Sequence, residues 1–204
     1  MHDLTARARL RNVALRLFGE LGFAATSIRV IAAEAGVSPA LVRHHFNSKE
    51  GLRASVDEEV LRRFGQTLSE MDHASPSGEL MSSLGAMSAR MFGIDPEVRS
   101  YLRRVLLEDS QASSVFFGQL LEGARKELSH LAEADLLRDD IDPTWAPCQL
   151  LFVAVGPMLL EPVLRPNIDL ELFDPTVLAQ RSQANQRFVA HGLIKADQED
   201  ISDS

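Results

Sequence analysis

The sequence predicts an all-α fold, and three features of the chain lead to that prediction. Apolar residues recur at helical spacing in one segment after another, beginning with a helix at about residues 5–21. Asp-Pro pairs at residues 95–96, 142–143 and 174–175 mark helix starts, because Asp accepts from free N–H groups and proline tolerates the first helical position. No segment shows convincing strand character, and there is no repeat or low-complexity stretch. We therefore expect packed helices throughout.

Two short helices separated by a tight turn are expected after the first helix. The first has its apolar residues at helical spacing, with Thr26 or Ser27 as the N-cap and Gly36 as the stop. The second begins one residue later, where Ser38 supplies a capping oxygen and Pro39 occupies the first helical position. A short turn with glycine between two helices fits a helix-turn-helix.

The second of these helices has two different faces. Val42 and Phe46 point to one side, whereas Ala40, Arg43 and His44 point outward. A small residue beside Arg and His lets a helix approach a DNA duplex closely and offers donors to base edges and phosphates. The outward face is therefore the expected reading face.

The next helix begins beside this reading face. Asn47 and Glu50 have the spacing of a capping box, which leaves Lys49 in the first turn with a side chain long enough to reach a phosphate. The candidate DNA-contacting residues lie in or beside the two short helices: Thr26, Ser27, Ser38, Pro39, Ala40, Arg43, His44, His45 and Lys49.

The remaining chain continues the helical pattern. A long helix at about residues 48–71 begins in the helix-turn-helix domain, called the reading head below, and ends well outside it. We therefore expect this helix to be the mechanical link to the rest of the protein. Pro76 and Gly78 interrupt the pattern. Further helices are expected at about residues 79–92, from Asp95, at 112–135, from Asp142, and from Asp174 to about Gly192.

Three sequence blocks occur in a characteristic order: L-R-L-F-G-E-L-G-F from Leu15, then T-S-I-R-V-I-A-A-E-A-G-V-S, then H-F-N-S-K-E-G-L. This order closely resembles the DNA-binding domain of TetR-family (tetracycline-repressor-like) transcriptional regulators, over about the first quarter of the chain. The resemblance implies a homodimeric, ligand-responsive regulator, usually a repressor, that holds its inducer in the larger domain. It also implies a dimer interface of four helices, here at residues 143–164 and 176–192. Arg43 stands where the family usually has an aromatic residue.

The charge of the chain is distributed unevenly. Residues 1–53 contain 8 Lys and Arg against 4 Asp and Glu, although the whole chain has a net charge of −8. The basic N-terminal segment is therefore expected to bind a polyanion. The acidic charge of the remaining residues argues against a protein that coats DNA or RNA along its whole length. We expect a helix-turn-helix DNA-binding domain at residues 1–50 and a larger helical regulatory and dimerisation domain at residues 51–204.

A homodimer is also expected on physical grounds. One short recognition helix makes too few base contacts for genomic specificity, so two heads should bind a pseudo-palindromic operator in double-stranded DNA. Residues 150–160 are apolar all round and would leave a large apolar surface on a monomer.

A small-molecule effector site is expected in the C-terminal domain. Its candidate residues combine apolar side chains with a few polar groups: Met87, Met91, Tyr101, Phe117, Trp145, Gln149 and Phe152. Each of them alone is more often an ordinary core residue, and only together do they favour a ligand site, so both interpretations remain open. Because no inward cluster of Arg or Lys is available to neutralise an anion, a flat or apolar uncharged ligand is favoured.

The sequence carries no pattern typical of a catalytic or metal centre. No nucleophile elbow, phosphate loop or dinucleotide fingerprint occurs, and the adjacent His44 and His45 point about 100° apart on a helix, which makes a poor chelate. The single cysteine, Cys148, excludes an intrachain disulfide and a multi-cysteine zinc site. We expect no cofactor, no metal and no enzyme activity.

The expected compartment is the cytoplasm, with no membrane association. The N-terminal helix lacks the apolar core of a signal peptide, and the apolar run at residues 150–160 is too short for a bilayer core that needs about 20 residues. Two alternatives from other classes remain: an all-helical enzyme acting on an apolar small molecule, and a protein-binding adaptor that uses the helix-turn-helix without DNA.

Overall fold

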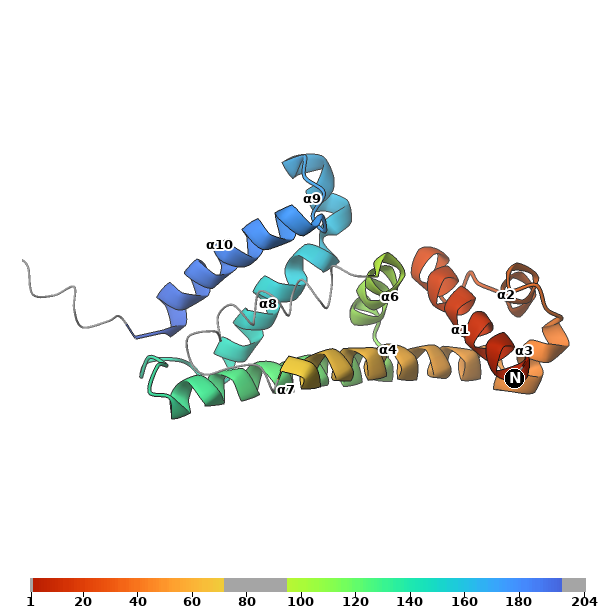
Figure 1. Cartoon of the computed structure of the whole chain (residues 1–204), viewed down its shortest axis with the longest axis horizontal. Helices are drawn as coiled ribbons and strands as arrows, with labels where there is room; N and C mark the ends of the chain where they lie inside the picture. The colour runs from red at the N-terminus through yellow and green to blue at the C-terminus, as the bar shows by residue number, and fades with distance from the viewer. Residues whose placement is uncertain (1, 72–94, 196–204) are drawn as a thin grey trace, which may run out of the picture. The chain divides into compact units, whose positions relative to one another are not determined.

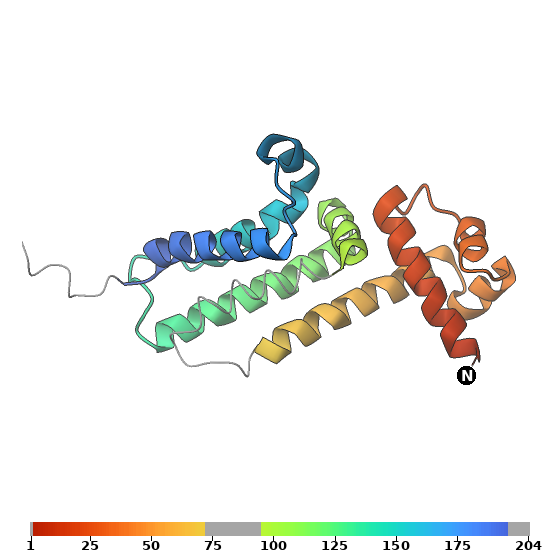
Figure 2. The ribbon, with the colours of Figure 1, turned by 45° about the horizontal axis from the view of Figure 1, so that its top comes forward.

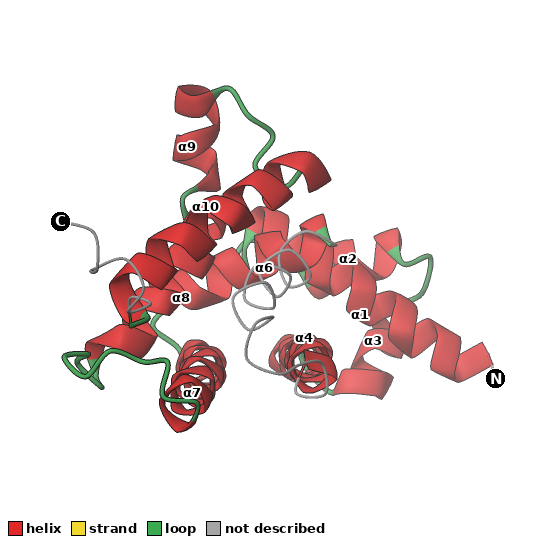
Figure 3. Ribbon diagram, turned by 60° about the vertical axis from the view of Figure 1, so that its left-hand side comes forward, coloured by secondary structure: helices red, strands yellow, loops and turns green. Residues whose placement is uncertain are grey.

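The computed structural model describes the backbone at residues 2–71 and 95–195 (Figure 1). Every regular element in these two ranges is a helix, and Figure 3 colours the chain accordingly. The one β feature in the described ranges is an isolated antiparallel bridge between Leu137 and Ile194. The all-α prediction is therefore confirmed. The expected helix at residues 79–92 lies outside the described residues.

Contacts divide the chain into two compact units. Unit 1 comprises residues 1–66 and 95–116, and unit 2 comprises residues 67–94 and 117–204. Residues 51–66 and 95–116 thus share a unit with the helix-turn-helix, whereas the sequence motif alone ends at about residue 50. The division into a DNA-binding domain and a regulatory domain at that point stays a prediction.

Unit 1 contains the three N-terminal helices and two later segments. Its helices are α1 (His2–Leu21), α2 (Ile28–Glu34), α3 (Pro39–Phe46), α4 (Lys49–Met71) as far as residue 66, and α6 (Pro96–Leu107). Figure 2 shows α2 and α3 on one side of α1 and α6 on the other. The largest fully buried side chains of this unit are Leu10, Phe18, Ile31, Val42, Leu52, Val56, Val60, Tyr101, Val105 and Phe116.

Unit 2 is built from the later helices. They are α7 (Gln111–Glu133) from residue 117 onward, α8 (Trp145–Leu159), α9 (Glu161–Ile168) and α10 (Pro175–Leu193). Asp174 begins α10 as expected, since its carboxylate accepts from the backbone N–H groups of Thr176 and Val177. A buried cluster joins α7, α8 and α10 through Leu128, Leu131, Ala146, Val189 and Leu193.

Two details of the later helices differ from the sequence-based expectation. The segment at residues 143–164 is two helices rather than one, because α8 ends at Leu159 and α9 continues at a bend of 74°. Pro162 lies in the first turn of α9, where proline is tolerated, whereas in a continuous helix its ring would clash with the preceding turn. In α7 the inward aromatic residue is Phe116, at 1% exposure, while the expected Phe117 is 39% exposed.

No single helix among the described residues is long and apolar enough to cross a membrane. By length and composition alone, α8 and α9 would satisfy the test together, despite the bend between them.

Candidate nucleic-acid interface

The two helices of the helix-turn-helix begin at serine caps. Ser27 Oγ accepts a hydrogen bond from the backbone N–H of Val30 at 3.3 Å, which identifies Ser27 rather than Thr26 as the N-cap of α2. Ser38 Oγ accepts from the backbone N–H of Leu41 at 3.3 Å and caps α3. Gly36, at φ +66°, makes the left-handed turn between the helices that glycine allows without strain.

The faces of α3 are those that the sequence predicts. Val42 is fully buried and Phe46 is 5% exposed, whereas Ala40, Arg43 and His44 are exposed to solvent. Burial of the first two fixes the rotation of α3 about its axis, because the apolar face must stay on the core. The small residue and the two hydrogen-bond donors are therefore available on the opposite face.

The junction between α3 and α4 differs from the expected capping box. Asn47 ends α3 at a positive φ of 63°, and Ser48 caps α4 by accepting from the backbone N–H of Gly51 at 3.0 Å. A methyl group on Gly51 would overlap the carbonyl oxygen of Phe46. Only glycine therefore permits α4 to begin so close to the end of the reading helix.

Lys49 does not extend toward solvent, which corrects its expected role at a phosphate. Its ammonium group donates to the carbonyl oxygens of Phe23 and Thr26, both at 2.8 Å, and lies 4.3 Å from the centroid of the Phe23 ring. The charge is used to hold the α1–α2 turn, because a cation satisfies carbonyl groups and an aromatic face together.

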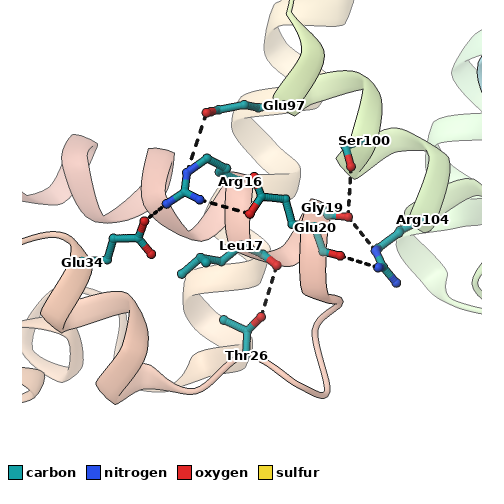
Figure 4. A network of polar contacts seen from close by, with 9 residues as sticks. All are labelled: Arg16, Leu17, Gly19, Glu20, Thr26, Glu34, Glu97, Ser100 and Arg104. Carbon is teal, nitrogen blue, oxygen red and sulfur yellow. Dashed lines mark hydrogen bonds and ion pairs between the residues drawn. The ribbon is translucent and has the colours of Figure 1, made fainter.

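Thr26 and His45 are also turned toward the protein rather than toward solvent. Thr26 is 1% exposed, and its hydroxyl lies 2.8 Å from the carbonyl oxygen of Gly22 and 3.3 Å from that of Leu17, the second contact being drawn in Figure 4. His45 is half-buried with its ring 6.0 Å from that of Phe46. The side chains of both residues serve the fold of the head.

Several arginines of unit 1 form ion pairs within the unit. Arg16 pairs with Glu20, Glu34 and Glu97, as Figure 4 shows, and so joins α1 to both α2 and α6. Arg11 lies 3.5 Å from Glu59, a carboxylate on α4. These cations are neutralised within the unit and have little charge left to offer a phosphate.

Other arginines remain available among the described residues, Arg7 with only the Phe46 ring beneath it and three more with no aromatic contact. In the described part of the chain, Arg9, Arg29 and Arg43 make no hydrogen bond or ion pair, and all three are exposed. Free guanidinium groups keep their full charge and all of their donors for an external anion. Sequence reasoning identified Arg43 but missed Arg9 and Arg29, because pairing depends on carboxylates that lie far away in the sequence.

The predicted effector-site residues do not form one buried cluster among the described residues. Tyr101 belongs to unit 1, where its hydroxyl donates a hydrogen bond to Asp57 at 2.5 Å. Trp145 and Phe152 share a face of α8 with Gln149, as their spacing predicts, but that face is exposed, at 58% for each aromatic residue. Met87 and Met91 lie outside the described residues.

Among the side chains that the structure describes, at residues 5–63 and 95–195, no group of three His, Cys, Asp or Glu is placed to hold a metal ion.

Comparisons with known proteins agree with this arrangement. Residues 10–56 match the family model described as bacterial regulatory proteins, tetR family. The chain is 34% identical over 141 residues to the HTH-type transcriptional regulatory protein RaaS of Mycobacterium tuberculosis, a match that covers 69% of this chain and 64% of that protein. It is 36% identical over 92 residues to the HTH-type transcriptional regulator BetI of Rhizobium meliloti, covering 45% of each. The chain thus spans less than two thirds of the length of either relative.

The fold is similar to that of a solved gamma-butyrolactone receptor described as ArpA-like. The TM-score is 0.75, with 20% sequence identity and coverage of 96% of this chain and 92% of that one. At that identity the likeness concerns the fold alone. The relatives matched by sequence are transcriptional regulators and not enzymes.

Proposed function

Because this chain belongs to the tetR family of bacterial regulatory proteins, we propose that it is a transcriptional regulator that binds double-stranded DNA through α2 and α3. The observation that carries the proposal is the outward face of α3. Ala40, Arg43 and His44 are exposed there, and the Arg43 guanidinium is unpaired among the described residues. A protein that works on chromosomal DNA acts in the cytoplasm.

The contacts divide into two kinds. Arg43 and His44 would donate to base edges in the major groove, and the small side chain of Ala40 would allow the helix to come close. Phosphates would be met by the exposed Arg29 and by the N-terminal backbone of α2 and α3, at Ser27 and at Ser38 with Pro39, where free N–H groups and the helix dipole favour an anion. Base contacts give sequence preference, and phosphate contacts give affinity that depends on salt.

We propose a homodimer formed through α8 and α10. Their outward faces carry large apolar side chains with no covering partner in the described protomer: Trp145 and Phe152 on α8 and Phe188 on α10, the last at 71% exposure. Gly156 on α8 and Gly192 on α10 have nothing within 4 Å of an added Cβ, which leaves room for another helix to approach. A second copy would cover this apolar surface, as a stable soluble dimer requires.

A second copy also provides what operator recognition needs. Two heads related by a two-fold axis would bind two half-sites of a pseudo-palindrome and double the number of base contacts. The proposed repression follows if the bound dimer excludes other proteins from a promoter. An apolar, uncharged small molecule would release it, provided that the molecule binds the non-DNA state more tightly.

Selection of DNA from a random pool tests this function directly. Wild-type protein should enrich a pseudo-palindrome whose half-sites are related by two-fold symmetry, and footprinting should protect both halves. Enrichment of no sequence above background, in low salt that strengthens any DNA binding, would contradict the proposed function and favour the protein-binding adaptor.

A further inference from the structure

A partly buried network of polar side chains joins α4 to α6 inside unit 1. Tyr101, at 2% exposure, donates its hydroxyl proton to Asp57 of α4 at 2.5 Å. Arg53, one turn earlier on α4, lies 3.9 Å from Asp57 and also pairs with Glu108 at the end of α6. Neither the DNA-reading face nor the apolar face of unit 2 uses these four residues.

The same network reaches the turn that precedes the reading helices. The Arg53 guanidinium lies 4.9 Å from the centroid of the Phe23 ring, on which the Lys49 ammonium also lies. Lys49 in turn holds the carbonyl oxygens of Phe23 and Thr26. A continuous set of contacts therefore runs from α6 through α4 to the α1–α2 turn.

The stability of the Asp57 carboxylate depends on how its partners are placed. Burial raises the pKa of Asp57 by penalising the charged form, while the Tyr101 hydroxyl and the Arg53 charge oppose that rise. Burial and the neighbouring Asp57 raise the pKa of Tyr101, so its hydroxyl stays protonated and acts as the donor. A half-buried carboxylate is stabilised when its partners are correctly placed, so these contacts favour the observed register of α6 on α4.

The position of the network in the chain gives it a functional consequence. The chain crosses between unit 1 and unit 2 three times, within α4 after residue 66, just before Asp95, and within α7 after residue 116. Ser113, in the first turns of α7, lies 2.5 Å from the carbonyl oxygens of Val105 and Glu108 and so ties that helix to the end of α6. The two crossings that lie within helices, in α4 and in α7, thus start from helices that the network holds together.

We propose that Tyr101 is a positioning residue for operator binding, which acts through Asp57 and Arg53 to fix the direction in which the two connecting helices leave the reading head. The inference rests on the proposed function, since it requires a dimer that binds DNA. In such a dimer a loosened joint lets each head still bind a half-site. Two heads would then no longer be held at one spacing, and affinity for two linked half-sites would fall.

The test compares a full operator with an isolated half-site, both taken from the sequence that wild-type protein selects. Tyr101→Phe keeps the buried ring and removes only the hydroxyl. We expect its full-site affinity to fall at least about fivefold, the lower range of an allosteric coupling, while its half-site affinity stays within about twofold of wild type. Fluorescence anisotropy at one fixed salt concentration measures both.

Val105→Ala is the matched control. Val105 is 1% exposed on α6 and has no polar side-chain atom, so its truncation lowers stability without removing a contact of the network. The ratio of full-site to half-site affinity should be that of wild type in this variant. The inference would be overturned if Tyr101→Phe left the ratio of full-site to half-site affinity unchanged. It would also be overturned if Val105→Ala changed that ratio as much as Tyr101→Phe does.

A second variant keeps the inference testable if Tyr101→Phe does not fold. Glu108→Gln removes a charge at the exposed end of the network, where the Glu108 side chain is 36% exposed, and should lower the ratio in the same direction. A folded Glu108→Gln protein with an unchanged ratio would then refute the positioning role. Wild-type protein that binds neither duplex would instead refute the proposed function itself.

Discussion

Replacing Gly19 by alanine should destabilise the protein, although alanine is normally the better helix former. Gly19 lies in α1, where an added Cβ would stand 3.0 Å from the backbone nitrogen of Tyr101 and 3.3 Å from Ser100 Cβ. The neighbouring backbone cannot easily retreat, because α6 is bonded to the same turn of α1. Ser100 Oγ donates to the Gly19 carbonyl oxygen at 3.0 Å and Arg104 Nε at 2.6 Å, as Figure 4 shows.

The expected size follows from three contributions. Alanine in a helix interior gains about 1 kcal/mol over glycine. Overpacking against a fixed backbone costs about 1–3 kcal/mol, and separating α1 from α6 would weaken hydrogen bonds that each contribute about 1 kcal/mol. The free energy of unfolding should therefore fall by about 1–3 kcal/mol, which lowers the melting temperature by about 2–10 °C.

Gly118→Ala is the matched control, since it makes the same change inside α7. Nothing lies within 4 Å of an added Cβ at Gly118, so only the helix preference of alanine applies, and a gain of about 0.5–1 kcal/mol is expected. Thermal unfolding followed by circular dichroism, at one protein concentration, compares the two variants. Equal stabilisation by both substitutions would refute the close approach of α6 to Gly19.

Further predictions concern the turn, the dimer and acid stability. Lys49→Met keeps the aliphatic part of the side chain over Phe23 and removes the hydrogen-bond donors. The melting temperature should therefore fall, while the salt dependence of DNA binding stays the same. If the slope of log affinity against log salt concentration fell by about 1, Lys49 would contact a phosphate, as the sequence suggested. Phe152→Asp and Phe188→Asp should each yield monomers in sedimentation, whereas Gln119→Asp, on an exposed part of α7, should remain dimeric; dimers in all three would place the interface elsewhere. Hydrogen bonds from Arg62 and Arg63 hold the pKa of Glu59 at about 2, below its ordinary value of 4.5, so its stabilisation is complete above about pH 4.5 and is lost as the pH falls toward 2. Denaturant titrations should therefore show a gap between wild type and Glu59→Gln at pH 6 that narrows below pH 4, and a gap independent of pH would contradict this origin.

Helix positions and the orientation of the reading helix could be predicted because both depend on local sequence. Serine and aspartate caps, proline at the first helical position and apolar spacing act within a few residues of one another. They place α3 correctly, with Val42 and Phe46 inward and Arg43 and His44 outward. The break at Leu160 was missed because Pro162 is compatible both with a turn and with a new helix start.

The roles of individual polar side chains could not be predicted in the same way. Lys49 finds its carbonyl partners at Phe23 and Thr26, more than twenty residues earlier in the chain. Asp57 and Tyr101 are separated by 44 positions, so no local pattern pairs them. Which cations are free for DNA is therefore a property of the tertiary structure.

The outward aromatic face of α8 illustrates a related difficulty. Helical spacing groups Trp145, Gln149 and Phe152 correctly, but spacing does not say whether the shared face meets a cavity, a core or another molecule. Their exposure in the protomer is what shifts the interpretation from an effector pocket toward a subunit interface.

The most direct test of the central claim is the affinity of single-arginine variants for the selected operator, measured over a range of salt concentrations. Arg43→Ala should weaken binding by about 1–3 kcal/mol and relax sequence preference at one base position. Arg29→Ala should weaken binding to all sequences alike and reduce the salt slope by about 1. Arg125→Ala, which removes an exposed arginine of α7, should behave as wild type. If the Arg43 and Arg29 variants instead bind the operator as tightly as the Arg125 variant, α2 and α3 are not the DNA-reading surface.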